Sequence, residues 1–244
     1  MATPTAPGPA PSNQPDPLAQ RAVSGVRPGM TVGLGTGRAA TRAIHALAAR
    51  AASERLDITC VATSVASHDL GLKLGLKVIP MEQATSVDFL FDGADEVDPQ
   101  LRMVKGRGGA MTREKIVAAA VVPHARGGLK IGRVYLIDDA KLVRQLGEKM
   151  PLPIEVMRFG LASVTRRLAE IGLSGPIRQK DGKDYLTDNN NLVIDAALPS
   201  NRPPEAFAQA LDAMEGIIDH GLFLTEADEI LIEDGKGNVR TMTR

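Results

Sequence analysis

The sequence predicts an α/β protein in which a parallel sheet carries helices on both faces and a smaller α+β domain follows. In the first two thirds of the chain, short apolar or β-branched runs alternate with amphipathic stretches, as is typical of parallel sheets covered by helices. After Pro151 and Pro153 the order becomes strand, helix, strand, strand, helix, strand, which predicts a ferredoxin-like domain. The 244 residues, 43% of them hydrophobic, are enough to bury a core for both parts.

The individual elements follow from local periodicity and turn residues. In the first part, strands are predicted at 31–34, 57–61, 77–79, 87–91 and 134–137, with a helix at 41–52 among the amphipathic stretches between them. In the second part, strands are predicted at 154–157, 177–179, 192–196 and 222–224, and helices at 162–171 and 204–218. The turn Asp181-Gly182-Lys183 is expected to help join the middle strands of this domain, and the run 229–232 is expected to return to the first sheet.

These elements divide the chain into a proline-rich tail at 1–17 that we expect to be disordered, a large domain at 18–150 and 225–244, and a small domain at 151–224. The tail has neither the basic start nor the apolar centre of a signal peptide, and no stretch reaches the roughly 20 apolar residues of a membrane span. We therefore expect a cytoplasmic protein without membrane partners. Lys plus Arg equal Asp plus Glu at 29 each, which gives no support for nucleic-acid binding. The single Cys60, in an apolar run, is expected to be buried.

The first predicted strand runs into Gly33-Leu34-Gly35-Thr36-Gly37, where a helix is expected to begin. Such a loop presents free amides to an anion, although a glycine-rich turn that serves only close packing is the alternative. A dinucleotide site is disfavoured, because Ala39 and Ala40 follow Arg38 and break the required glycine spacing. The Arg38 guanidinium either pairs with a phosphate or is solvated.

Polar residues also follow the second and fourth predicted strands. Thr63 and Ser64 are either helix caps or ligand contacts. The run 92–98 contains four acids, whose carboxylates either bind Mg²⁺, cap a loop, or bind sugar hydroxyls and transfer protons.

A glycine loop at 105–110 then places Lys105 beside these acids, and a predicted helix carries Glu114. A lysine near a sugar carbonyl stabilises enediolate charge, while a carboxylate moves a proton between adjacent carbons. The alternative for Glu114 is a surface residue in a charged helical turn.

Together these segments resemble the type A family of ribose-5-phosphate isomerases over nearly the whole folded chain. The segments that carry the resemblance are 33–37, 63–64, 92–98, 105–110, 113–115 and 151–156, with support from 187–189 and 221–223. The run Asp-Gly-Ala-Asp-Glu-Val-Asp, the lysine-glycine loop and Arg-Glu-Lys are specific as a set.

The resemblance implies a Rossmann-like large domain, a homodimer or homotetramer, and interconversion of ribose 5-phosphate and ribulose 5-phosphate without metal or cofactor. By motif position, Glu114 matches the general base, Asp92 and Asp95 the carboxylates that open the ring and bind hydroxyls, and Lys105 the cation beside the enediolate. The implied substrate-binding residues are Gly35, Thr36, Gly37, Arg38, Ala39, Thr63, Ser64, Gly93, Ala94, Gly106, Arg107, Gly108 and Lys141.

The chain departs from the family pattern where phosphate is expected to bind. Arg38 and Ala39 replace a serine and a threonine, and the lysine usual near the N-terminus is missing, its approximate place falling at Pro15. Arg107 and Ala140 replace a usual glycine and serine. Our hypothesis is that Arg38, with Arg107 as a second candidate, supplies the hydrogen bonds that the lost side chains made.

Three other functions compete with this one. They are isomerisation of another aldose phosphate, Mg²⁺-dependent phosphoryl transfer at the acid cluster, and binding of a sugar phosphate by a sensor without turnover.

Overall fold

The computed structural model describes residues 16–122, 124–126 and 129–244. Its largest element is a six-stranded sheet with the strand order β16-β15-β8-β3-β1-β2. The strands are β1 (Thr31–Leu34), β2 (Thr59–Ala62), β3 (Phe89–Gly93), β8 (Arg133–Asp138), β15 (Glu229–Glu233) and β16 (Val239–Thr243). Five of them run parallel, and only β16 lies antiparallel to its neighbour. The predicted return of the chain at 229–232 to the first sheet is confirmed.

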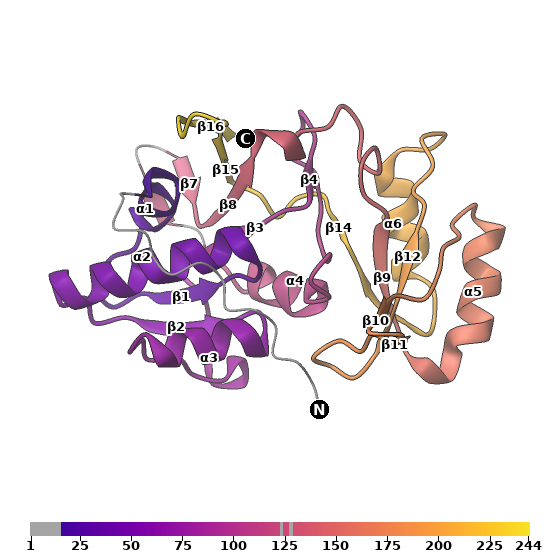
Figure 1. Ribbon diagram of the computed structural model, residues 1–244, viewed down its shortest axis with the longest axis horizontal. Helices are drawn as coiled ribbons and strands as arrows, with labels where there is room; N and C mark the ends of the chain where they lie inside the picture. Colours follow the sequence, from indigo (N-terminus) through magenta and orange to yellow (C-terminus); the bar gives the residue numbers. More distant parts are fainter. Residues whose placement is uncertain (1–15, 123, 127–128) are drawn as a thin grey trace.

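Helices cover both faces of this sheet, as predicted (Figure 1). They are α1 (Pro17–Val23), α2 (Arg38–Glu54), α3 (Val65–Lys73) and α4 (Met111–Ala119). On one face, Ile44 and Leu47 of α2 pack with Phe91 of the sheet. On the other, Val117 of α4 packs with Leu90. Cys60 is buried in the first of these clusters, as expected.

The small domain is built on an antiparallel sheet with the order β12-β9-β13. Its elements are β9 (Leu152–Val156), α5 (Leu161–Glu170), β12 (Leu192–Ala196), α6 (Pro204–Asp212) and β13 (Ile217–His220). The predicted strand at 177–179 is reduced to one antiparallel bridge, between Ile177 and Ile194. In chain order β9 is the first strand of the domain, the segment at 177 the second, β12 the third and β13 the fourth. The first strand lies between the third and the fourth, and the second pairs with the outer edge of the third, which is the ferredoxin-like order.

One helix boundary and the pairing of one strand differ from the prediction for this domain. The helix expected at 204–218 ends at Asp212, because the chain turns through Gly216, whose φ of 95° favours glycine. The residues that follow form β13, so β13 is the fourth strand of the domain. The predicted strand at 222–224 is instead β14 (Leu222–Phe223), which pairs with β5 (Met103–Val104), itself paired with β4 (Glu96–Val97).

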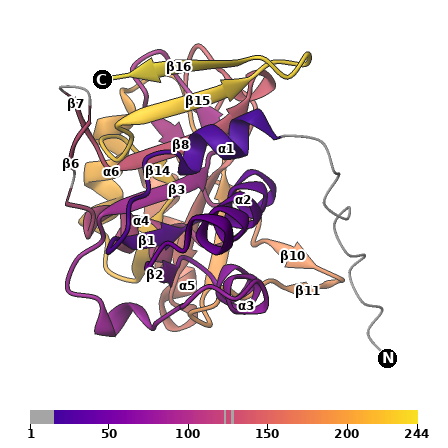
Figure 2. The same ribbon diagram turned by 90° about the vertical axis from the view of Figure 1, so that its left-hand side faces the viewer.

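The turn at Asp181-Gly182 closes a separate hairpin instead of joining the middle strands. It connects β10 (Gln179–Lys180) with β11 (Lys183–Asp184), and both turn residues have positive φ, as type I′ turns require. This hairpin projects from the small domain (Figure 2).

The predicted strand at 77–79 is also wrong. Val78 makes a single parallel bridge with Cys60, and Pro80, which lacks an amide hydrogen, follows at once. The remaining short elements are β6 (His124–Arg126), β7 (Leu129–Ile131) and the 3₁₀ turns η1 (Met81–Gln83), η2 (Asp139–Lys141) and η3 (Arg158–Gly160).

The chain's N-terminal end differs in part from expectation. Residues 1–15 of the predicted tail lie outside the described residues, but Asp16 caps α1 by accepting a hydrogen bond from the Ala19 amide at 3.0 Å. Asp16 also pairs with Arg42 of α2. Within the described ranges, no helix is both long and apolar enough to cross a membrane.

Two buried polar side chains differ in how their hydrogen bonds are satisfied. The Glu155 carboxylate in β9 accepts bonds from the hydroxyls of Thr112 and Thr187 and from the side-chain amides of Asn189 and Asn191. The Tyr135 hydroxyl in β8 is buried and has no hydrogen-bond partner among the described residues. An unsatisfied buried hydroxyl carries its desolvation cost without compensation.

We therefore expect Tyr135→Phe to leave the free energy of unfolding unchanged or to raise it by up to about 1 kcal/mol. The matched control is Thr187→Val, which also removes one oxygen but breaks the Thr187 hydrogen bond to Glu155, and should cost about 1–3 kcal/mol. Urea denaturation of both variants measures the difference. A loss for Tyr135→Phe as large as that of the control would contradict the assignment of this hydroxyl as unpaired.

Candidate active site

The predicted site residues gather where β1 and β3 end, at the point where the order of the large sheet reverses. The chain leaves β1 toward β2 on one side, and leaves β3 toward β8 on the other. Ligands of open α/β sheets bind in the crevice at such a point. Residues 35–39 follow β1, and Asp92 is the penultimate residue of β3. Lys105 follows β5, and Glu114 lies in the first turn of α4.

The buried Asp92 carboxylate links the loop after β1 to the lysine. Its Oδ1 accepts hydrogen bonds from the amides of Thr36 at 2.8 Å and Gly93 at 2.7 Å, and its Oδ2 lies 3.0 Å from Lys105 Nζ. A Cβ at position 35 would lie 2.3 Å from Asp92 Oδ1, so Gly35 is required for this approach. Burial raises the pKa of Asp92, and the charge of Lys105 opposes the rise.

Lys105 is a buried cation between two carboxylates. Its ammonium lies 3.0 Å from Asp92 and 3.2 Å from Glu114, and it donates to the Gly93 carbonyl. The rings of Tyr135 and Phe223 lie 5.3 and 5.4 Å from Nζ. Burial alone would lower the pKa of Lys105, but the two carboxylates raise it above the ordinary lysine value. The group is therefore charged at neutral pH.

Glu114 is only 5% exposed, so its interpretation as a surface residue is wrong. Burial raises its pKa to about 8, and the attraction of Lys105 works in the opposite direction. Its Oε2 lies within ion-pair distance of Lys105 Nζ, but no described residue donates a hydrogen bond to this atom. A buried carboxylate oxygen without a donor is available to accept a proton.

Asp95 and Lys141 lie at the rim of this group. Asp95 Oδ2 accepts a hydrogen bond from the Arg107 amide at 2.9 Å, and Lys141 Nζ donates to the Ala94 carbonyl at 2.6 Å. Burial lowers the pKa of Lys141, and the charges of Asp95 and Asp138 oppose the fall. A cavity of about 200 Å³ opens beside Asp95 and the exposed Arg107.

The loop at 35–39 has the geometry of an anion cradle. Gly37 precedes the 17-residue helix α2 with a φ of 95°, which favours glycine, and Arg38 and Ala39 form the start of the helix. The first amides of a helix lack intrahelical partners. Thr36 faces the second glycine loop, because a Cβ on Gly108 would lie 3.7 Å from Thr36 Cγ2.

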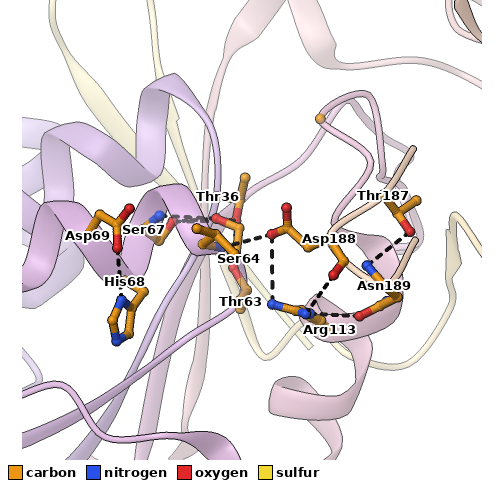
Figure 3. Close-up of polar contacts among 12 residues, drawn as sticks. Thr36, Thr63, Ser64, Ser67, His68, Asp69, Arg113, Thr187, Asp188 and Asn189 are labelled. Atoms are coloured by element: carbon orange, nitrogen blue, oxygen red, sulfur yellow. Dashed lines mark hydrogen bonds and ion pairs between the residues drawn. The ribbon is translucent and has the colours of Figure 1, made fainter. Parts of the chain in front are cut away.

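The hydroxyls of Thr63 and Ser64 cluster around that of Thr36 (Figure 3). The Thr36 hydroxyl lies 2.7 Å from that of Thr63 and donates to Ser64 Oγ at 2.8 Å. Thr63 also donates to the Leu34 carbonyl, and Ser64 caps α3 by accepting from the Ser67 amide at 3.1 Å. The cap formed by Ser64 confirms the capping alternative for this residue, and both Thr63 and Ser64 are buried against Thr36.

The four acids of the run 92–98 do not converge on one point. Glu96 accepts hydrogen bonds from the amides of Gly147 and Met150, while Asp98 binds the Arg102 side chain. Among the described residues, no group of three or more acid, histidine or cysteine side chains is arranged to hold a metal ion. Glu96 and Asp98 are loop caps, which was one of the open alternatives.

Several residues that support the site were not predicted individually from sequence. Arg178 and Tyr185 hydrogen-bond to carbonyls of the loop 106–108. Arg113, beside Glu114, donates to Asn189 Oδ1 at 2.8 Å and to the Asp188 carbonyl at 3.0 Å (Figure 3). These contacts join residues more than 70 positions apart, and no local pattern identifies them.

Comparison with known proteins identifies the family. The profile of ribose 5-phosphate isomerase A (phosphoriboisomerase A) matches residues 59–237. Ribose-5-phosphate isomerase A of Sphingopyxis alaskensis is 43% identical over 218 residues, which cover 89% of this chain and 90% of the relative. The counterpart from a Roseiflexus species is 41% identical over 223 residues, covering 91% and 92%.

Solved structures agree with this assignment over nearly the whole chain. Ribose 5-phosphate isomerase A of Methanocaldococcus jannaschii superposes with a TM-score of 0.84 at 33% identity, covering 93% of this chain and 96% of that one. A D-ribose-5-phosphate isomerase in complex with phospho-erythronic acid has the same TM-score and coverage at 31% identity. The chain belongs to the ribose-5-phosphate isomerase A family.

Proposed function

We propose that this protein interconverts D-ribose 5-phosphate and D-ribulose 5-phosphate through a cis-enediolate, with Glu114 as the base. The observation that carries the proposal is the buried Glu114 carboxylate, whose Oε2 has no described hydrogen-bond donor and lies 3.2 Å from the Lys105 ammonium. Abstraction of a proton beside a carbonyl needs such a base together with a cation at the developing oxyanion. The family, its relatives' names and this geometry support the same reaction.

The proposed sequence begins with ring opening at Asp92. Its carboxylate takes the proton of the C1 hydroxyl and returns a proton to the ring oxygen, which frees the C1 aldehyde. Glu114 then removes the C2 proton and the C1 carbonyl oxygen gains the electron pair. Glu114 returns the proton to C1, while the C2 hydroxyl loses its proton as the C2 carbonyl forms and the C1 oxygen gains one.

Lys105 stabilises the enediolate in this scheme. Its ammonium is buried and already fixed by Asp92 and the Gly93 carbonyl, so little reorganisation is needed when charge develops on the sugar. Asp95 and Lys141, at the rim, are proposed to bind substrate hydroxyls. The backbone of Gly93, Ala94, Gly106 and Gly108 forms the walls around them.

The phosphate is proposed to bind at the start of α2, where the amides after Gly37 point outward from the helix. The relative solved with phospho-erythronic acid supports a site for a phosphorylated acid in this fold. Arg38 is exposed and forms no hydrogen bond or ion pair with another described residue, so its guanidinium is free to approach a phosphate.

We further propose that the protein acts in the cytoplasm in the non-oxidative pentose phosphate pathway, as a homodimer or homotetramer and without metal or cofactor. The Mg²⁺ alternative loses support because the four acids diverge. Another aldose phosphate as substrate and a sensor without turnover remain the competing hypotheses. The complete set of Asp92, Lys105 and Glu114 in contact argues against a sensor.

We expect Glu114→Gln to lower kcat for ribose 5-phosphate by about 10²- to 10⁴-fold, because the amide cannot accept the C2 proton. The assay follows ribulose 5-phosphate formation by chelator-treated protein, and Glu170→Gln on α5 is the matched surface control. Near-normal turnover by Glu114→Gln would remove Glu114 from the mechanism. No turnover by the unmodified protein without Mg²⁺ would favour the competing functions.

The rate should also depend on pH in a way that reports the buried base. Burial raises the pKa of Glu114 from 4.5 to about 8, and only its deprotonated form accepts a proton. We therefore expect kcat/KM to fall as the pH decreases, because Glu114 in the free protein then becomes protonated. The midpoint of this fall should lie well above pH 4.5, the ordinary pKa of a glutamate. A profile that stays flat down to pH 5 would contradict a buried base with a raised pKa.

For Arg38→Ala we expect KM for ribose 5-phosphate to rise about 10- to 100-fold, which corresponds to the loss of a hydrogen bond to a charged group. kcat should change little, since Arg38 lies at the phosphate end of the site. Arg38→Lys tests whether charge alone suffices, and Arg166→Ala on α5 is the control. An unchanged KM in Arg38→Ala would refute the compensation hypothesis.

A further inference from the structure

Three consecutive carbonyl groups of the glycine loop are held by side chains of the small domain. Arg178 Nη1 donates to the Gly106 carbonyl at 2.9 Å and to the Arg107 carbonyl at 3.0 Å. The Tyr185 hydroxyl donates to the Gly108 carbonyl at 3.0 Å. The segment that begins at Lys105 is thus tied along its length to one neighbour.

Arg178 is itself fixed in place. Its Nε and Nη2 form a bidentate pair with Asp195 of β12, at 2.9 and 2.5 Å. The guanidinium lies 5.7 Å from the centre of the Tyr185 ring, and the Tyr185 amide donates to the Arg178 carbonyl at 2.9 Å. A planar guanidinium satisfies a carboxylate and two carbonyls at once, and a lysine ammonium cannot reproduce this fork.

The direction of the carbonyls determines what the loop presents to the site. Because the carbonyls of residues 106–108 face the small domain, the amides are left for other partners. The Arg107 amide binds Asp95, whereas those of Gly106 and Gly108 donate to no group in the described part of the chain. Lys105 Nζ, at the start of this loop, lies between Asp92 and Glu114.

The loop also needs to be held, because its conformation is open to alternatives. Gly106 and Gly109 have φ values of 102° and 75°, in the region that glycine enters freely. A Cβ on Gly109 would lie 2.3 Å from the Tyr185 hydroxyl, so Tyr185 packs directly against the loop backbone. Small errors in the placement of catalytic groups cost on the order of 10²-fold in rate.

We propose that Arg178 and Tyr185 are positioning residues, which clamp the loop 105–109 so that the Lys105 ammonium and the free loop amides face the enediolate. The inference rests on the proposed isomerase function and adds residues from the small domain to it. The two residues touch the loop carbonyls and act on the reaction only through the loop.

The test compares Arg178→Ala, Arg178→Lys and Tyr185→Phe with the unmodified protein in ribose 5-phosphate isomerisation. We expect Arg178→Ala to lower kcat on the order of 10²-fold with KM changed by less than about threefold, because the phosphate loop is untouched. Tyr185→Phe removes one neutral hydrogen bond and should lower kcat by about fivefold. Arg178→Lys should stay impaired by more than about tenfold, because the ammonium lacks the fork.

Two controls separate positioning from loss of stability. Arg167→Ala breaks an exposed ion pair with Glu215 on the same domain and should leave kcat unchanged. Added guanidinium ion should restore part of the activity of Arg178→Ala, and not that of Glu114→Gln. The proposal is overturned if kcat of Arg178→Ala lies within threefold of the unmodified value. If that variant does not fold, an unchanged kcat in Tyr185→Phe overturns the proposal instead.

A measurement without substrate distinguishes failure of this inference from failure of the proposed function. Hydrogen exchange of the hydrogen-bonded loop amides, those of Lys105, Arg107 and Gly109, should be faster in Arg178→Ala than in unmodified protein, while exchange in α2 is unchanged. If the unmodified protein does not isomerise ribose 5-phosphate, the function is wrong and the clamp is judged on exchange alone. Exchange that is equal in the two proteins overturns the clamp.

Discussion

The site depends on one buried cation between two carboxylates. Lys105 lies 3.0 Å from Asp92 and 3.2 Å from Glu114, and all three side chains are nearly inaccessible to solvent. Removing charges from water is costly unless they are paired, so each of these groups depends on the others and on fixed dipoles around them. The Thr36 and Gly93 amides and the Gly93 carbonyl supply those dipoles, which explains why the loops meet so closely here.

Within this group one carboxylate oxygen, Glu114 Oε2, pairs with the Lys105 charge but accepts no directed hydrogen bond, and we propose that this atom accepts the proton. Asp92 has donors on both oxygens, whereas Glu114 Oε2 has none among the described residues. The two carboxylates therefore differ although both are buried beside the same lysine. In the mechanism that we propose, Asp92 exchanges protons with the sugar hydroxyls, and Glu114 accepts the proton from carbon. Thr112, two residues before Glu114 on α4, donates to Glu155 of the small domain, which ties the start of this helix to that domain.

Local patterns predicted the fold, and the family resemblance pointed to the central residues of the site, but neither identified the contacts that fix them. The strands at 31–34 and 192–196 were predicted to the residue, because each is a short apolar run with clear ends. The helix at 204–218 was predicted too long, since apolar residues of β13 continue the helical pattern past Gly216. No local sequence pattern marks Arg178, Tyr185 or Asp195. The role that we propose for them depends on contacts with a loop that lies about 70 residues earlier in the chain.

The same electrostatics bears on phosphate recognition. The buried group has a net negative charge when both acids, Asp92 and Glu114, are ionised, because Lys105 supplies only one positive charge. This charge repels a phosphate dianion, so binding of the phosphate is favoured only at a distance from the group. The start of α2, where we propose that phosphate binds, provides that distance and the unpaired amides of a helix N-terminus. Arg38 adds a full positive charge there, but it is exposed, so water and salt screen its attraction. At this position Arg38 therefore offers a screened cation, where a small hydroxyl side chain would offer a neutral donor.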